Sequence, residues 1–510
     1  MSKIGLSLIV VITGLLMACS EPYQPKPFKE LNRDPNKDVF HDIVSQAIAF
    51  DPPIHPFLNP AGLNSMHADA YNSDVHDVAV NFSADKEIYI KTRIGNAFLG
   101  GQCATLTFRQ DGLIQAICAG ALGFHIQLIE PRSLNMLADY SMPTRPSTYE
   151  ALVHWDRSKV MLDSSGAYFF IDPNDHVWIA NSEHKILELK AQKSGDTYHY
   201  VEVNSWDISS AVDHDCLRPT NPFPSGKCDP ITGLLNDYQD TLWWISRFGK
   251  VGTLNKNTGE IQTLDLNEEI QNGFAVAQEG VYIVSDHALY LFTQDEKQSP
   301  KIVWREAYDR GQTSKLGSIN QGSGTTPTIF GDYITITDNA DERINLVVYR
   351  RQAEDNRLVC KVPLFDINSS ATENSMIALN NSVVIENNAG FSNAHQHTDY
   401  SIVGKGVTRI DVTEDGQSCS VVWNKPIAVP SVVPKLASKS GIVFVYSFET
   451  QPNNTNDWYL VGLDFSSGNE VFRIHTGNGK DYNNNFSPIT LGPDQTVYIG
   501  TSKGLVALWQ

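Results

Sequence analysis

Side chains that carry oxygen recur in short clusters in the second half of this chain. Three of these clusters place a carboxylate beside an amide: Asp338-Asn339, Glu373-Asn374 and Glu386-Asn387. Carboxylate and amide oxygens are the ligands of Ca²⁺, which takes six to eight of them. If the fold gathers these clusters, then Asp338, Glu373 and Glu386 form a candidate metal site, and calcium is the cation it would hold. The competing interpretation is ordinary turn chemistry, because Asn and Asp side chains bond the local backbone.

Other groupings point to chemistry less clearly. His395-Gln396-His397 with Asp399 has metal-ligand types, but its long polar surroundings favour a solvated loop. His67 and Asp69 would serve either as a general-base pair or as residues that hydrogen-bond an N-terminal plug to the main domain. The sequence has no GxSxG nucleophile motif and no CxxC or CxxCH, which argues against a serine hydrolase of that type, a zinc ribbon and attached c-type haem.

The N-terminus predicts export and lipid attachment. Residues 1–18 carry one early cation and then an uncharged apolar run, as in a secretory signal. Leu16-Met17-Ala18-Cys19 resembles the lipobox of bacterial lipoproteins, which implies acylation of Cys19, and Ser20 implies the outer membrane, facing the periplasm or the cell surface. We expect a flexible tether over 19–38, rich in Pro and charge, and a segment over 39–75 packed on the main domain.

Composition narrows the class of protein. The formal net charge is −19 without a basic cluster, so nucleic acid is not an expected partner. Six cysteines remain after Cys19, an even number that predicts disulfides in an oxidising compartment. The shortest loops give the pairs Cys103–Cys118, Cys216–Cys228 and Cys360–Cys419, although sequence alone allows 15 connectivities.

Repeats predict an all-β fold. Segments 325–337, 432–446 and 486–500 each have a Pro, a strand, a tight polar turn and a second strand, and weaker copies cover 167–181, 231–246, 273–285 and 373–387. Copies recur every 40–60 residues or so, the spacing of four-stranded propeller blades. We therefore expect a single β-propeller over 76–510 with eight blades, seven being the alternative. A strand from within 76–95 would complete the last blade and close the ring.

The outer half of each unit carries a family likeness. Similar turns at 254–260 and 463–470 are expected between the two outer strands of their units. Aromatic residues stand on the outermost strands of several units (Trp304, Trp423 and Phe472). This pattern resembles the PQQ-like, or quinoprotein-type, propeller superfamily, as an uncharacterised bacterial lipoprotein branch of it. The segment ITDNADERINLVVY also resembles a strand pair of calcium-dependent lactonase-type propellers, which implies a central Ca²⁺ that polarises an ester carbonyl.

Propeller topology sorts the loops onto two faces. Loops that enter each blade and loops that join second to third strands share one face, where ligands usually bind at the channel mouth. The candidate ligand residues on that face are Asp286, His287, Asp338, Asn339, Glu373, Asn374, Glu386, Asn387, Lys435 and Asn485.

Three functions follow from these observations. The first is a non-enzymatic lipoprotein, held in the bilayer through Cys19, whose channel face binds an envelope protein, a peptide, a polysaccharide or a small molecule. The second is a calcium-dependent lactonase or esterase. The third is a quinone-dependent dehydrogenase, implied only by the superfamily likeness. That likeness would imply a stacking Trp and a pair of adjacent cysteines at the cofactor, and the sequence has no two adjacent cysteines.

Overall fold

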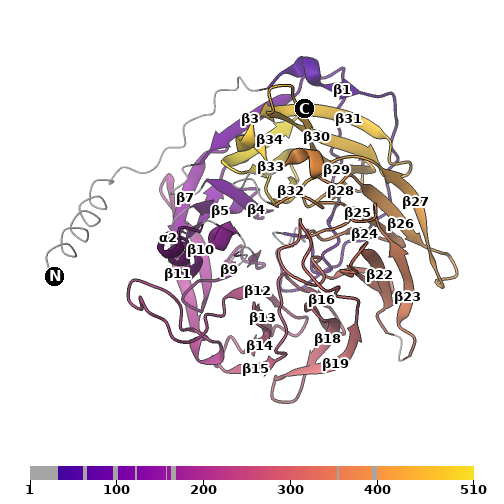
Figure 1. Ribbon diagram of the computed structural model, residues 1–510. Coiled ribbons are helices and arrows are strands. Elements are labelled where there is room, and N and C mark those ends of the chain that lie inside the picture. The colour runs from indigo at the N-terminus through magenta and orange to yellow at the C-terminus, as the bar shows by residue number, and fades with distance from the viewer. Residues whose placement is uncertain are drawn as a thin grey trace.

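The computed structural model describes residues 33–60, 66–95, 101–120, 123–156, 158–161, 163, 168–352, 355–392 and 399–510. Cys19 with its lipobox, most of the expected tether and the His395–His397 motif lie outside the described residues. Eight sheets stand around a central axis as a ring (Figure 1). The all-β, eight-bladed propeller predicted from the repeats is confirmed, and seven blades is wrong.

The first four blades follow one another along the chain. They comprise β4 (Gln102–Phe108), β5 (Ile114–Gly120), β6 (Gly123–Ile129) and β7 (Met136–Ser141); β8 (Phe170–Ile171), β9 (Val177–Ala180), β10 (Lys185–Ser194) and β11 (Thr197–Asp207); β12 (Ile231–Asn236), β13 (Leu242–Ser246), β14 (Lys250–Leu254) and β15 (Ile261–Asp265); and β16 (Ala275–Ala277), β17 (Gly280–Val284), β18 (Ala288–Gln294) and β19 (Pro300–Ala307). Each sheet is antiparallel from its innermost to its outermost strand.

The last four blades repeat this order. They comprise β20 (Thr328–Phe330), β21 (Tyr333–Thr337), β22 (Asn345–Arg350) and β23 (Leu358–Pro363); β24 (Ile377–Leu379), β25 (Ser382–Glu386), β26 (Val407–Val412) and β27 (Cys419–Lys425); β28 (Lys435–Ala437), β29 (Ile442–Thr450), β30 (Asn456–Asp464) and β31 (Glu470–Asn478); and β32 (Ile489–Leu491), β33 (Val497–Thr501) and β34 (Gly504–Trp509). The eighth blade thus receives only three strands from the C-terminal end.

An N-terminal strand closes the ring. The strand β3 (Tyr89–Ile94) pairs antiparallel with β34, with Thr92 opposite Val506. It completes the eighth sheet with a strand from the other end of the sequence, as predicted. Two shorter N-terminal strands extend blade 7: β1 (Val39–Phe40) lies outside β31, and β2 (Val75–His76) lies parallel to β28 on the inner side. Pairing of both kinds leaves fewer exposed strand edges.

The core lies between neighbouring blades. Central strands are apolar on both faces, since each sheet is covered by the next sheet on either side, and β13 and β17 are buried along nearly their whole length. Trp243 and Trp244 are 1% and 0% exposed and belong to the cluster shared by blades 2 to 4. They pack between neighbouring blades.

All three predicted disulfides are present. Cys103–Cys118 joins β4 to β5, Cys216–Cys228 closes a loop before blade 3, and Cys360–Cys419 connects β23 of blade 5 to β27 of blade 6. Three disulfides indicate an oxidising compartment. Within the described ranges, no helix is long and apolar enough to cross a bilayer.

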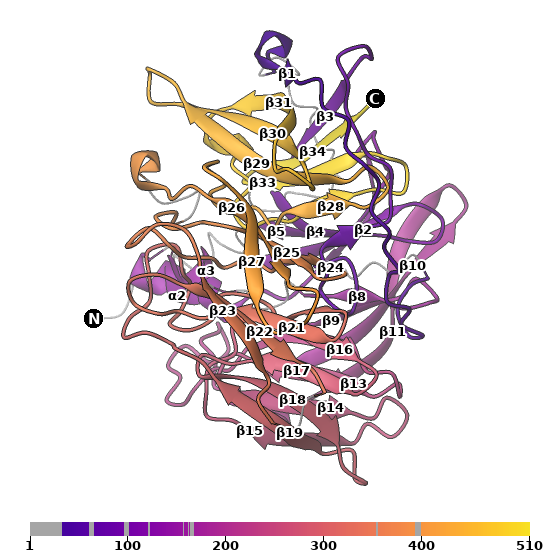
Figure 2. The ribbon, with the colours of Figure 1, turned by 90° about the vertical axis from the view of Figure 1, so that its right-hand side faces the viewer.

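The two faces of the ring differ in what covers them. We call the face with the turns between first and second strands the first face, and the opposite one the second face. The N-terminal segment runs down one side of the ring, whereas the helices α2 (Pro146–His154) and α3 (Ser158–Met161) lie on the other (Figure 2). The carbonyl of Ala49 accepts a hydrogen bond from Asn380 in the β24–β25 turn, which places this segment on the first face.

Candidate functional site

The N-terminal segment continues into the channel and pairs with successive innermost strands. Backbone N–H groups of blades 4 to 7 donate to its carbonyls in chain order: Val276 to Ala70, Ile329 to Tyr71, Ala378 to Ser73 and Leu436 to Asp74. These bonds satisfy the inward edges of four three-residue strands. Residues 66–78 therefore act as a plug, a name we keep below for this segment.

A buried polar network fastens the plug. The Lys435 ammonium pairs with the Asp74 carboxylate and also donates to the Met66 carbonyl at 2.8 Å. Ser375 donates to the other oxygen of Asp74 and lies 2.6 Å from His67 Nδ1. Burial is the largest single effect on Asp74 and opposes its ionisation, but the charges of Lys435 and His67 and their hydrogen bonds together outweigh it and hold the pKa of Asp74 below its usual value. The network is thus an internal ion pair with hydrogen-bonded neighbours.

This network has the residue types of a catalytic triad without access for a substrate. His67, Ser375 and Asp74 are 3%, 2% and 0% exposed. Asp69 accepts from the backbone N–H groups of Tyr71 and Ser73, and burial raises its pKa to about 7. The positions favour the plug interpretation of His67 and Asp69 over the general-base interpretation, because a general base must reach the proton it takes.

The candidate metal ligand Asp338 is saturated by local partners. Asn345 donates to it from its backbone N–H at 2.7 Å, and Lys361 Nζ lies 2.8 Å from Oδ2. The side chain has no exposed surface. It neutralises a lysine of its own blade instead of facing the channel.

Glu373 and Glu386 are buried, each with one oxygen bonded and one without a hydrogen-bond partner in the described part of the chain. Oε1 of Glu373 accepts from Ile319 N at 2.9 Å, and Oε1 of Glu386 accepts from Asn374 Nδ2 at 2.6 Å. Burial raises the pKa of both carboxyls to about 8. At neutral pH burial therefore favours the neutral acid form of both groups.

The remaining candidates also bond within the protein. Asp286 pairs with Arg310 at 2.6 Å and with His287 at 2.8 Å. The amide groups of the others bind nearby main-chain or side-chain atoms: Asn339 to Arg310 and Thr313, Asn374 to Val432, Asn387 to Ser369, and Asn485 to Gln102. Lys435 belongs to the plug. These residues shape the loops of the second face.

The structure does not bring the three predicted carboxylates together. A cluster of three His, Cys, Asp or Glu ligand atoms within 4.8 Å of one another occurs once among the described residues. It consists of Asp172, His176 and Glu188. Asp338, Glu373 and Glu386 are instead held separately by the partners given above. The physical reason is that one oxygen of each carboxylate is already bonded within the protein, and Asp338 also pairs with Lys361 of its own blade.

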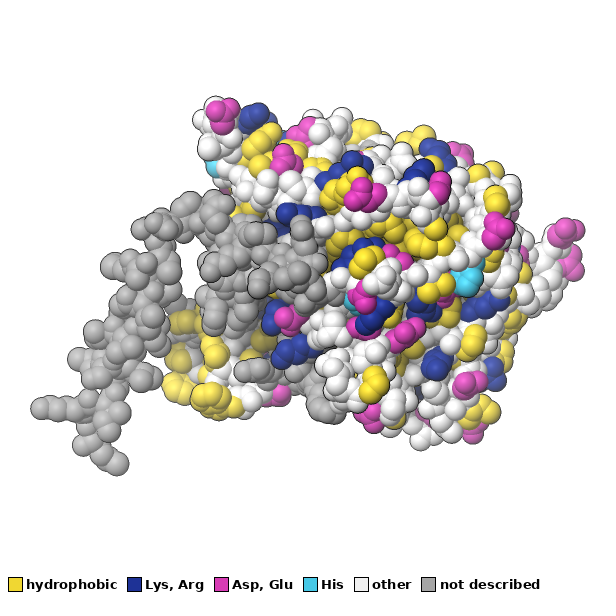
Figure 3. All heavy atoms as spheres, turned by 90° about the horizontal axis from the view of Figure 1, so that it is seen from above, with side chains coloured by type: hydrophobic (Ala, Val, Ile, Leu, Met, Phe, Trp, Pro, Cys, Tyr) yellow, Lys and Arg dark blue, Asp and Glu magenta, His cyan; other side chains and the backbone are white. Residues whose placement is uncertain are grey.

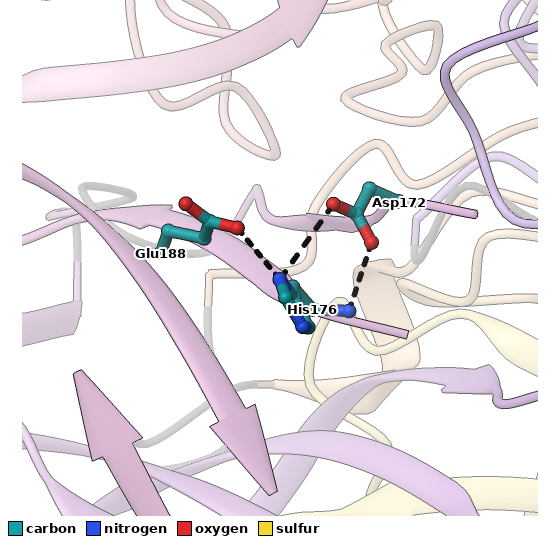
Figure 4. Close-up of side chains that lie close together, drawn as sticks. All are labelled: Asp172, His176 and Glu188. Carbon is teal, nitrogen blue, oxygen red and sulfur yellow. Dashed lines mark hydrogen bonds and ion pairs between the residues drawn. The ribbon is translucent and has the colours of Figure 1, made fainter. Parts of the chain in front are cut away.

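The Asp172 group has a structural explanation (Figure 4). His176 Nδ1 lies 2.6 Å from Glu188, while Asp172 accepts from the backbone N–H of His176 and from Trp178 Nε1. Blade 3 repeats the same arrangement without the histidine, since Asp237 accepts from the backbone of the β12–β13 turn and from Trp243 Nε1 at 2.8 Å. In both blades, therefore, an Asp on the first face holds the turn between the first and second strands and binds the indole N–H of a buried Trp.

Large apolar side chains exposed outside the strands lie mostly on the second face. Its loops and the helix α2 carry Leu152, Val153, Trp155, Phe223, Phe248, Leu316, Ile367 and Ile402, which are 48% to 93% exposed. Trp155, directly after α2, is the most exposed of them at 93%. Loops on the first-face side contribute Val44 and Ile54. Exposed aromatic and aliphatic side chains of this kind are residue types that interaction surfaces use.

An open pocket lies on the same face between blades 6 and 7, with a volume of about 420 Å³. Its lining residues are Tyr400, Ser401, Val403, Lys405, Pro426, Ile427, Ala428, Ser447, Phe448, Glu449, Thr450 and Arg473. They come from the β25–β26 loop, the entry to blade 7, the end of β29 and the first half of β31. We call this the blade 6–7 pocket. Sequence reasoning missed these residues because four separate segments contribute them.

Charges of both signs occur on the outer side of the ring where β1 and β31 lie. There, basic and acidic side chains are interspersed with apolar ones (Figure 3). That pattern differs from the basic stripe of a nucleic-acid-binding protein.

Comparison with known proteins finds only distant similarity. No family model matches the sequence. An uncharacterized protein of Archaeoglobus fulgidus is 23% identical over 318 residues, which is 55% of this chain and 61% of that protein's length. Among solved structures, a europium-containing methanol dehydrogenase is 9% identical over 88% of this chain and 98% of its own, with a TM-score of 0.48. A streptogramin B lyase is 10% identical over 83% of this chain and 97% of its own, with a TM-score of 0.37. Identities and TM-scores this low assign neither a family nor a function to this chain.

Proposed function

We propose that this protein is an exported, lipid-anchored binding scaffold whose second face docks an envelope protein. One observation carries the proposal: most of the large apolar side chains exposed outside the strands lie on the second face, while the N-terminal segment before the plug contacts the first face. Burying exposed Trp and Phe side chains supplies much of the free energy of protein association, and such residues are common hot spots.

A protein partner fits this face better than a bilayer. The exposed apolar residues lie on loops of several blades, with acidic groups such as Asp213 and Asp399 among the same loops. The chain has a net charge of −19, and anionic lipid headgroups repel such a surface. A protein surface can instead place donors and cations opposite the acids.

The lipid anchor places the scaffold at the membrane. Cys19 follows an uncharged apolar run in the sequence, and several acyl chains hold a protein far more firmly than one. The expected result is that Cys19→Ser abolishes palmitate labelling and releases the protein from the membrane fraction. A variant that still labels and still sediments with membranes would contradict this part of the proposal.

The docking surface is tested by paired substitutions. Trp155→Ser with Phe223→Ser removes two exposed aromatic side chains without touching the core, and should abolish chemical cross-linking of the protein to its partner in intact cells. Ile54→Ser, at 86% exposed on the first-face side, is the matched control and should leave the cross-link intact. Equal cross-linking by both variants would contradict the proposal, and selective loss of membrane association by the first variant would indicate a lipid surface instead.

The calcium-dependent hydrolase stays a second candidate on one observation. Glu373 and Glu386 each keep a buried oxygen without a hydrogen-bond partner in the described residues, and a cation could take up such oxygens. The separate partners of the three carboxylates and the raised pKa of these two favour the scaffold. A calcium titration that shifts the unfolding temperature of wild type but not of Glu373→Gln would favour the hydrolase.

A further inference from the structure

We propose that the blade 6–7 pocket binds an acidic sugar, whose ring packs on Tyr400 and Phe448 and whose carboxylate pairs with Lys405. The proposal concerns a small-molecule site and stands apart from the docking of a protein on the same face. A volume of about 420 Å³ lies in the range of small-molecule sites.

The aromatic wall is fixed before a ligand arrives. The rings of Tyr400 and Phe448 meet edge to face with centroids 4.9 Å apart, and both pack on the buried Trp458 at 6.2 and 5.7 Å. Asn483 donates to the Tyr400 hydroxyl at 2.9 Å. Both rings are only half-buried, so each leaves surface for the apolar C–H side of a sugar ring. Fixed side chains lose little entropy on binding.

One cation in this pocket is available to an anion. Arg473 already makes a two-point contact with Glu470 and a further one with Glu449 at 3.2 Å. Lys405 is exposed and forms no ion pair with any described residue. In a chain of net charge −19, an unpaired lysine beside two aromatic rings marks a local preference for a negative group.

The rest of the lining suits a ligand rich in hydroxyls. Ser401 donates to Asp399 and Thr450 donates to Asn456, so their oxygens remain as acceptors toward the pocket. Glu449 adds a carboxylate acceptor at the rim. Sugar hydroxyls can donate to these oxygens, whereas a purely aromatic acid would leave them unmatched.

The test is isothermal titration of the full mature protein with methyl β-D-glucuronide. The matched probes are methyl β-D-glucoside, which lacks the carboxylate, and benzoate, which has a ring and a carboxylate without hydroxyls. The glucuronide should bind at least about tenfold more tightly than either, since a charge-assisted hydrogen bond and matched hydroxyls are both needed. Equal affinities, or no heat of binding up to millimolar glucuronide, would overturn the proposal.

Variants locate the binding in this pocket. Lys405→Met should weaken the glucuronide about tenfold and leave the glucoside unchanged, whereas Lys480→Met, an exposed lysine on the same face outside the pocket, should change neither. Tyr400→Phe should keep binding and Tyr400→Leu should lose it. Unchanged affinity in Lys405→Met would overturn the proposal. A linear polyuronate that binds more tightly than the monomer would identify a polysaccharide as the source, and equal affinity a free sugar acid.

Discussion

The ion pair between Asp74 and Lys435 should fasten the plug to the ring, and Asp74→Asn tests this. Asp74 is fully buried and Lys435 is 2% exposed at its side chain, so the substitution leaves an ammonium whose remaining hydrogen-bond partner among the described residues is the Met66 carbonyl. Loss of one member of a buried pair costs about 3–5 kcal/mol in the free energy of unfolding. The entropy of unfolding is about 2.1 cal/mol/K per residue, or roughly 1 kcal/mol/K for a domain of this size, so the unfolding temperature should fall by about 3–5 °C.

The control is a solvent-exposed pair from the same segment. Asp77 and Lys439 lie 2.8 Å apart but are 41% and 57% exposed at their side chains, so Asp77→Asn should cost at most about 1 kcal/mol. Adding Lys435→Met to Asp74→Asn should restore part of the loss, because it removes the unpaired charge. Calorimetry at pH 7 measures wild type, Asp74→Asn, Asp77→Asn, Lys435→Met and the double variant. Equal effects of the two single Asp substitutions, or additive effects in the double variant, would refute the reasoning.

The difference in stability between wild type and Asp74→Asn should depend on pH. Lys435 lowers the pKa of Asp74 in the folded protein. The stabilisation is therefore present above the pKa that Asp74 has in the unfolded chain. It is lost as the pH falls through the lower pKa that Asp74 has in the folded protein. The gap between wild type and Asp74→Asn should accordingly narrow in acid.

Three further outcomes follow from the buried acids and the disulfides. The pKa of Glu373 is raised to about 8 from 4.5, so its contribution to stability is present at low pH and declines as the pH rises toward 8. In denaturant titrations, the fall of the free energy of unfolding with pH over this range should become less steep in Glu373→Gln, by up to about 1.4 kcal/mol per pH unit. Replacing Cys360 and Cys419 by Ser should cost about 4 kcal/mol, and replacing Cys216 and Cys228 about 3 kcal/mol, because the closed loops span 59 and 12 residues; a larger loss from the shorter loop would contradict this. Calcium should leave the unfolding temperature of wild type unchanged at pH 7, and a clear rise would contradict the scaffold.

The blades and disulfides were predictable because their signals are local. A Pro, a strand, a polar turn and a second strand recur at each blade, and the pairs Cys103–Cys118 and Cys216–Cys228 close short loops. The face of each loop follows from strand order alone. These features depend on neighbours in sequence and on the fixed alternation of strand direction.

The candidate site was harder to predict because it depends on contacts between blades. Oxygen-rich loops look alike whether they bind a cation or their own backbone, and the Lys361 partner of Asp338 lies on another strand of the blade, 23 positions along the chain. The blade 6–7 pocket draws Tyr400, Phe448 and Arg473 from three separate elements. A partial signal exists in Phe448, an aromatic residue near the solvent end of β29.

Site-specific photo-cross-linking in intact cells measures the central claim most directly. A photoreactive amino acid would replace Trp155 or Phe223 on the second face, and Val44 or Ile54 on the first-face side; all four are exposed. The scaffold predicts one discrete cross-linked protein from both second-face positions and none from the other two. Cross-links from Val44 and Ile54 alone, or the same products from all four positions, would contradict it.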